Sequence, residues 1–146
     1  MNIEDLEHWH FDLTEESANK LLNLVLEGKK RATSSSYPGY LVEGDPIPKV
    51  GDMSVITDWD GNPRCVIKTT KVQIIPFNEI TFDLASLEGE DENLQSWRTK
   101  HEAFFLEESK EVGYTFTPDM KVVFEQFEVV SVCGRRVLPV KGLCSG

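Results

Sequence analysis

Apolar residues near the start of the chain recur with the period of an α-helix. They fall at i, i+3, i+4, i+7 and i+8 and form one stripe, made of Ala18, Leu21, Leu22, Val25 and Leu26. Thr14 stands where it can cap this helix, and Gly28 follows the stripe at a position where glycine commonly ends a helix. The pattern therefore predicts a helix that ends at Gly28.

A second stripe with the same period lies over residues 92–108, and it consists of Leu94, Trp97, His101, Phe104 and Phe105. We expect Asp91 to cap this second helix. The segment from Asn78 to Leu87 is expected to form one or two short helical turns.

Apolar and β-branched residues predict strands over residues 53–58, 64–75 and 121–133. Asp60-Gly61 is typical of a hairpin turn between the first two strands, and Gly134-Arg135 is expected to lead into a last short strand. Serine, proline and glycine dominate the roughly 17 residues that start at Ser34, which we expect to form a long loop.

Strands dominate the middle and end of the chain, with helices before and between them. This order predicts an α+β fold with a small antiparallel β-barrel or a strongly curled sheet. No internal repeat or linker interrupts the pattern, so we expect one domain over residues 1–138 and a C-terminal tail over residues 139–146.

Composition narrows the classes of function. The chain has 146 residues, a hydrophobic fraction of 40% and a formal net charge of −10. No apolar run approaches the ~20 residues that span a bilayer, and the acidic start does not resemble an export signal, so we expect a cytoplasmic protein with no membrane partner. The negative charge opposes tight binding of long nucleic acids through their phosphates, and a small ligand fits it better.

Several common sites have no counterpart in the sequence. The three cysteines have no CxxC spacing, so we expect reduced thiols rather than a zinc site or a disulfide framework. His8 and His10 flank Trp9 without a third ligand at suitable spacing, which gives little support to a metal site. No phosphate-binding glycine loop, HExxH or GxSxG motif occurs, and we expect neither a metal nor a cofactor.

The segment from Gly28 to Thr33 is the first candidate for chemistry. It brings lysines and a threonine hydroxyl together just beyond a helix end. A lysine held against apolar walls can lose its proton and act as a base, and a neighbouring threonine can then become a nucleophile. The alternative is a solvated basic helix end that the helix dipole stabilises.

The segment from Glu88 to Glu92 is the second candidate, because four carboxylates crowd into five residues just before a predicted helix. Such acids commonly do no more than complement the helix dipole. Alternatively, one of them points into a pocket, where it positions water or pairs with Lys30.

Trp97, Arg98 and His101 are the third candidate. His101 lies on the apolar stripe, where a histidine is either a packed core residue or a ligand. Arg98 lies beside the stripe, and we expect it to pair with the acidic segment.

These segments together resemble the ASCH domain family. Gly28-Lys29-Lys30-Arg31-Ala32-Thr33 resembles its GxKxxT motif, and Pro48 to Asp52, Pro76-Phe77, Glu88 to Glu90, the helix around Trp97 and the strand from Val122 to Val130 follow in the family's order. The likeness covers roughly residues 13–132.

The resemblance implies a PUA-like fold: a small β-barrel with helices packed around a cleft. It also implies an activity on RNA or a modified nucleoside, such as amide hydrolysis of an acetylated cytidine-type nucleoside. The implied catalytic residues are Lys30 as a neutral base, Thr33 as the nucleophile and Glu90, with Glu88 as the other possible carboxylate. The residues expected to bind the substrate are Gly28, Arg31, Ser34, Tyr37, Tyr40, Glu88, Trp97, Arg98 and His101. A non-catalytic binding module and a metal-dependent ribonuclease are the alternatives.

Overall fold

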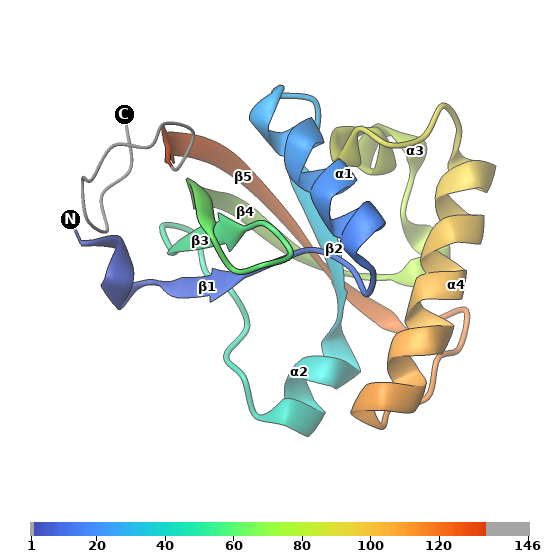
Figure 1. Cartoon of the computed structure of the whole chain (residues 1–146). Coiled ribbons are helices and arrows are strands. Elements are labelled where there is room, and N and C mark those ends of the chain that lie inside the picture. Colours follow the sequence, from blue (N-terminus) through green and yellow to red (C-terminus); the bar gives the residue numbers. More distant parts are fainter. Residues whose placement is uncertain (1, 134–146) are drawn as a thin grey trace.

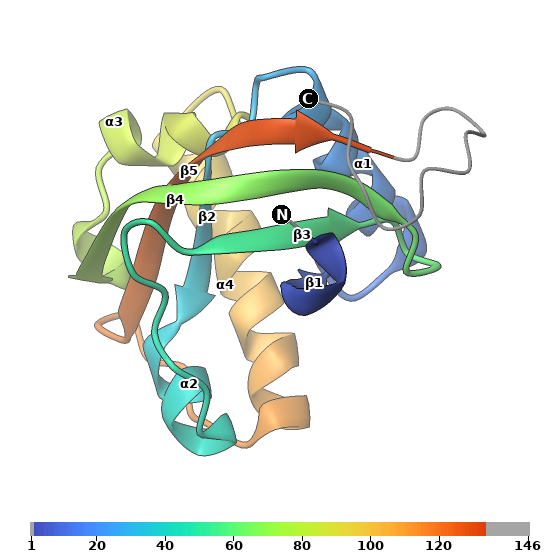
Figure 2. The same ribbon diagram turned by 90° about the vertical axis from the view of Figure 1, so that its left-hand side faces the viewer.

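Five strands form one curled sheet in the order β1-β3-β4-β5-β2. A computed structural model describes residues 2–133 of the chain. The strands are β1 (Glu7–Trp9), β2 (Ala32–Ser36), β3 (Met53–Thr57), β4 (Pro63–Pro76) and β5 (Lys121–Val132). Neighbouring strands are antiparallel, except that β1 pairs with β3 in parallel. The sheet curls into a half-barrel whose two edge strands are β1 and β2 (Figure 2), so the predicted α+β fold with a small barrel is confirmed.

Four α-helices flank the sheet, and α1, α3 and α4 lie on the same side of it (Figure 1). They are α1 (Glu15–Leu26), α2 (Tyr37–Glu43), α3 (Phe82–Ala85) and α4 (Leu94–Val112). Three short 3₁₀ helices accompany them, η1 (Ile3–Asp5), η2 (Phe77–Glu79) and η3 (Ser86–Glu88). The predicted first helix is confirmed, with Thr14 accepting a hydrogen bond from the backbone of Ser17 as its cap.

Two clusters of buried side chains fix the helices on the sheet. The stripe of α1 packs through Leu22 and Val25 onto Ile67 and Phe127 of the sheet. Trp97 and Phe105 of α4 form the second cluster with residues of the preceding short helices, such as Phe77. The two apolar stripes read from the sequence are therefore the faces that hold α1 and α4 in place.

The long loop predicted from Ser34 onward is wrong in its first half. Residues 32–36 form β2, because each of them pairs with β5, from Ala32 opposite Gln126 to Ser36 opposite Val122. Residues 37–43 form α2, in which proline occupies the first turn, where its missing N–H costs nothing. A Cβ atom at Gly39 would lie 2.5 Å from the Ser36 hydroxyl, so a larger residue there would force the Ser36 side chain to move.

The start of the second long helix also differs from the prediction. Asn93 rather than Asp91 caps α4 and accepts a hydrogen bond from the backbone of Ser96. Asp91 instead accepts a hydrogen bond from the Ser96 hydroxyl and pairs with Lys100 at 2.9 Å. The predicted last strand at Gly134-Arg135 and the tail over residues 139–146 lie outside the described residues.

Two further expectations concern cysteines and membranes. Cys65 is a buried free thiol, but Cys133 is disulfide-bonded, so the expectation of three reduced thiols is wrong for Cys133. Between residues 2 and 133, every helix is too short or too polar to cross a bilayer.

Candidate functional site

Two segments that lie far apart in the sequence meet beside β2. The exit from α1 is joined to η3 by a hydrogen bond of 2.7 Å from the Arg31 amide to the Leu87 carbonyl. Gly89, which follows η3, has a φ of +75°, and a Cβ atom there would collide with the carbonyl of Lys29. A glycine is therefore required at this crossing, and it brings Glu88 and Glu90 against Lys30.

Lys30 is buried, with only 2% of its surface exposed. Its ammonium nitrogen Nζ lies 3.1 Å from Oε1 of Glu88 and 2.9 Å from Oε2 of Glu90, and 5.4 Å from the centre of the Phe11 ring. Burial alone would lower the pKa of Lys30, but the two carboxylates outweigh it and raise the pKa above its ordinary value. Lys30 is therefore a cation, and the prediction of a neutral base is wrong.

The two lysines of this segment have opposite environments. The side chain of Lys29 is 67% exposed and pairs loosely with Glu27, so the solvated basic helix end is correct for Lys29 and wrong for Lys30.

Glu88 is the centre of a buried network of hydrogen bonds. Besides Lys30, its carboxylate accepts hydrogen bonds from the Ser34 hydroxyl at 2.6 Å, the Trp97 indole at 3.0 Å and the His101 ring at 3.2 Å. Burial alone would raise the pKa of Glu88, but Lys30 and His101 hold it well below its usual range. The alternative that these acids do no more than complement the helix dipole is wrong for Glu88, because Glu88 is 2% exposed and accepts hydrogen bonds from four side chains.

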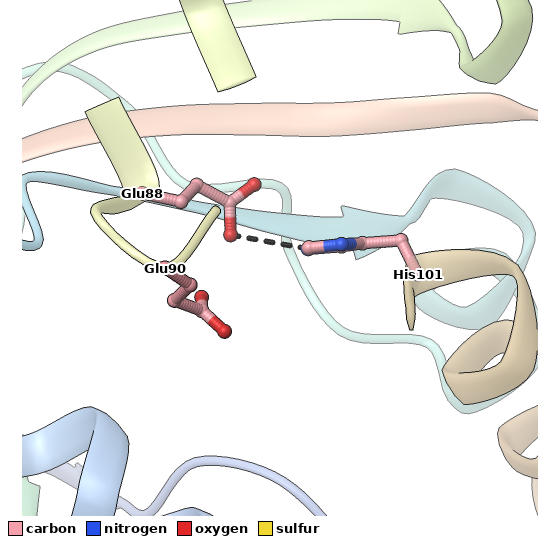
Figure 3. A group of neighbouring side chains, drawn as sticks. All are labelled: Glu88, Glu90 and His101. Carbon is pink, nitrogen blue, oxygen red and sulfur yellow. Dashed lines mark hydrogen bonds and ion pairs between the residues drawn. The ribbon is translucent and has the colours of Figure 1, made fainter. Parts of the chain in front are cut away.

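His101 extends the network from α4 toward Glu88, with Glu90 nearby (Figure 3). Its Nδ1 lies 2.9 Å from the Trp97 carbonyl oxygen and its Nε2 lies 3.2 Å from Glu88. Both partners accept hydrogen bonds, so the doubly protonated ring satisfies both contacts at once. Burial alone would lower the pKa of His101, but Glu88 raises it above the ordinary value. The ring also stacks on Trp97, with 4.1 Å between the ring centres, so His101 is both a packed core residue and a partner of Glu88.

A cleft of about 540 Å³ opens over this network. Six of the predicted site residues line it, namely Lys30, Thr33, Ser34, Glu88, Glu90 and His101. Phe11, Leu21 and Phe104 form apolar walls that the sequence alone did not assign to a site. Helical spacing identified Leu21 and Phe104 as stripe residues, but it could not reveal that the edges of two stripes face a common cleft.

The remaining predicted residues lie elsewhere. Trp97 is buried behind the cleft and contacts two of its lining residues, Glu88 and His101. Arg98 was expected to pair with the acidic segment, and this prediction is wrong. It instead donates a hydrogen bond to the Asn78 carbonyl at 3.2 Å. Tyr40 lines a different cavity. The others outside the cleft are Gly28, Arg31 and Tyr37.

The cleft also contains a geometry that suits a metal ion. Glu88, Glu90 and His101 each offer one ligand atom, and these atoms lie within 4.8 Å of one another. However, the Lys30 ammonium already lies within 3.1 Å of both carboxylates. A metal ion would therefore have to displace Lys30, so the donor set fits an ammonium better than a metal.

Comparison with known proteins gives a consistent result. Residues 7–131 match the ASCH domain. A crystal structure of a DUF984 protein from Enterococcus faecalis V583 is 38% identical, with a TM-score of 0.81 over 86% of this chain and 77% of that one. An ASCH domain from Lactobacillus crispatus JV V101 is also 38% identical, with a TM-score of 0.78 over 85% of this chain and 80% of that one. A hypothetical protein at 18% identity and a TM-score of 0.51 shares the fold alone. No curated protein matches the chain.

Proposed function

This chain belongs to the ASCH domain family, and from that premise we propose that it hydrolyses the amide of an acylated nucleoside, such as an acetylated cytidine. The observation that carries the proposal is that Lys30, Thr33 and Glu90 line one cleft, although Glu90 lies far from the other two in the sequence. The apolar walls of the cleft suit a base or an acyl group, and its charged floor suits a carbonyl that develops negative charge.

The hydrogen bonds and the exposure of the two carboxylates support different roles for Glu88 and Glu90. Glu88 is fully engaged by its four donors, so it anchors Lys30 and is not the reacting carboxylate. Glu90 accepts a hydrogen bond from Lys30 alone among the described residues, and its side chain is 15% exposed. Glu90 is therefore the general base, and the Lys30 cation stabilises the oxyanion.

The reaction then proceeds in two balanced steps. The Thr33 hydroxyl attacks the amide carbonyl carbon while its proton passes to Glu90, and the resulting oxyanion is stabilised by Lys30. When the C–N bond breaks, Glu90 returns the proton to the departing amine and Thr33 holds the acyl group as an ester. Water attacks the ester with Glu90 again as base, the carboxylic acid leaves, and the proton returns to Thr33.

The proposal is tested by incubating the purified protein with N4-acetylcytidine and measuring the release of acetate. Thr33→Val removes the hydroxyl and keeps the shape, and Glu90→Gln removes the base. Each is expected to lower kcat by about 10²–10⁴-fold, the usual contribution of such a group. Lys29→Met, at an exposed position, is the control and should keep the activity. No turnover by the wild type, or unchanged turnover in both cleft variants, contradicts the proposal.

A metal-dependent ribonuclease is the weaker alternative, because Glu88, Glu90 and His101 lie close enough to share one ion only if that ion displaces Lys30. RNA cleavage that requires a divalent metal and stops on addition of a chelator would favour it. Binding of a nucleoside without any product would instead favour a non-catalytic binding module.

A further inference from the structure

A second cavity of about 580 Å³ lies inside the half-barrel, and the proposed reaction does not use it. Every strand contributes to its lining, including Trp9 of β1, Ser54 of β3 and Thr69 of β4. Its volume falls within the range of small-molecule sites, roughly 300–1,000 Å³. A cavity of this size on the concave face of a sheet is large enough for a ligand.

This half-barrel cavity adjoins the cleft. Thr33, the proposed nucleophile, lines both of them. Trp9 lines the half-barrel cavity, Phe11 lines the cleft, and their rings contact each other edge to face at 4.8 Å. The two cavities therefore share Thr33 and this aromatic pair as a common boundary.

The charges around the half-barrel cavity have one sign. Glu125 is half-buried, and its Oε2 accepts a 2.6 Å hydrogen bond from the buried hydroxyl of Thr69. The other carboxylates of the lining belong to the exposed residues Glu7, Asp45 and Asp52, and no lysine, arginine or histidine of the described part of the chain lines the cavity. In contrast to Glu88, Glu90 and Asp91, none of these four acids has an ion-pair partner within residues 2–133.

The environment of the cavity changes the pKa of Glu125. Burial raises the pKa of Glu125, the Thr69 hydrogen bond opposes the rise, and the neighbouring Asp52 and Glu7 add to it. A cation bound among these groups would relieve the repulsion, and the rings of Trp9 and Tyr40 would attract it further. In the described part of the chain, the acids of this cavity do not bring three ligand atoms close enough for one metal ion. An extended organic cation fits them better.

We propose that the half-barrel cavity binds an organic ammonium group. This group is either part of the substrate whose amide lies at Thr33 or a separate amine bound beside it. The existence of the site does not depend on the proposed function, and only its assignment to the substrate rests on it.

The site is tested by titrating ¹⁵N-labelled protein with 1,4-diaminobutane and, as the neutral match, with 1,4-butanediol. The readout is the indole N–H of Trp9, which donates a hydrogen bond to Ser54 inside the cavity and is identified by its loss in Trp9→Phe. The diamine should shift this signal to saturation and the diol should leave it unchanged. Absence of a shift, or an equal shift with the diol, overturns the proposal.

A matched pair of variants locates the binding. Glu125→Gln keeps an acceptor for Thr69 and removes one charge, so it should weaken diamine binding about tenfold. Glu128→Gln makes the same change at an exposed position of the same strand and should have no effect. Equal affinities in the two variants contradict the site.

A comparison of two substrates distinguishes whether the ammonium group belongs to the substrate or to a separate amine. If the group belongs to the substrate, N4-(β-alanyl)cytidine should have a KM about tenfold below that of N4-acetylcytidine, and Glu125→Gln should remove the difference. Equal KM values together with saturable diamine binding support the site and assign it to a separate amine. If neither amide is hydrolysed, the proposed function fails, while the diamine titration still decides the site.

Discussion

Lys30 shows how burial and pairing act on a single residue. Its 2% exposure would force it to lose its proton if it were alone, but two carboxylates within 3.1 Å keep it charged. Removing one partner from such a buried pair costs about 3–5 kcal/mol, because the remaining charge is left without compensation.

Lys30→Met should therefore lower the free energy of unfolding by several kcal/mol, about 3–5. Glu90→Gln in the same chain should recover part of this loss, since Lys30 is the one described partner of Glu90 and its removal leaves that charge unpaired. Urea denaturation monitored by tryptophan fluorescence measures both variants. Lys29→Met, at the neighbouring exposed position, should change stability by no more than about 0.5 kcal/mol. Similar losses at positions 29 and 30 would contradict the buried network.

His101 gives the network a dependence on pH. Because its pKa in the folded protein is raised, its contribution to stability is complete below the unfolded pKa of about 6.5 and is lost as the pH rises through the folded value. His101→Gln should therefore destabilise the protein more at acidic than at alkaline pH. Denaturation of wild type and variant from about pH 6 to pH 9 measures the difference. An effect that is constant over this range would show that folding does not raise the pKa of His101.

At the scale of elements, Gly89 joins η3 to the exit of α1. Gly89→Ala destabilises the protein in two ways. Alanine at a positive φ costs about 1–2 kcal/mol, and its Cβ atom would also collide with the Lys29 carbonyl. Gly61→Ala is a matched control, because Gly61 has a φ of +89° but open space around it. We expect the substitution at 89 to be clearly more destabilising in thermal unfolding and also to lower the activity of the cleft. Equal losses would mean that the crossing is not tightly packed.

The sequence predicted elements whose signals are local. α1 has a capping threonine and a regular stripe, and β4 and β5 are rich in β-branched and aromatic residues, so they were found within a few residues. β2 was missed because its serines have weak strand preference, and it forms only through its pairing with β5. α2 was missed because Pro38 and Gly39 are usual in loops, although proline fits a first helical turn.

The candidate site was predictable in residue type but not in charge state. The basic and acidic segments could be named from the sequence, and the cleft brings Lys30, Thr33 and Glu90 together. The protonation of Lys30 could not be predicted, because it depends on two carboxylates about sixty residues away along the chain. The half-barrel cavity was not foreseen either, since its lining comes from all five strands.

At the scale of the whole molecule, the net charge of −10 favours a small substrate over RNA. We expect a single-stranded RNA oligomer to bind with a Kd weaker than about 10⁻⁴ M at physiological salt, because too few phosphates can be neutralised. Fluorescence anisotropy at several salt concentrations measures this. Tight binding that weakens steeply with salt would instead indicate a basic surface for RNA.

The account as a whole depends on Lys30 being a cation at the floor of the cleft. The most direct measurement is an NMR titration of its ε-carbon, assigned by its loss in Lys30→Met. The account predicts no titration step below the ordinary lysine value of 10.5. A step near pH 7–8, at about the pKa to which enzymes tune a basic lysine, would contradict it and restore the neutral base.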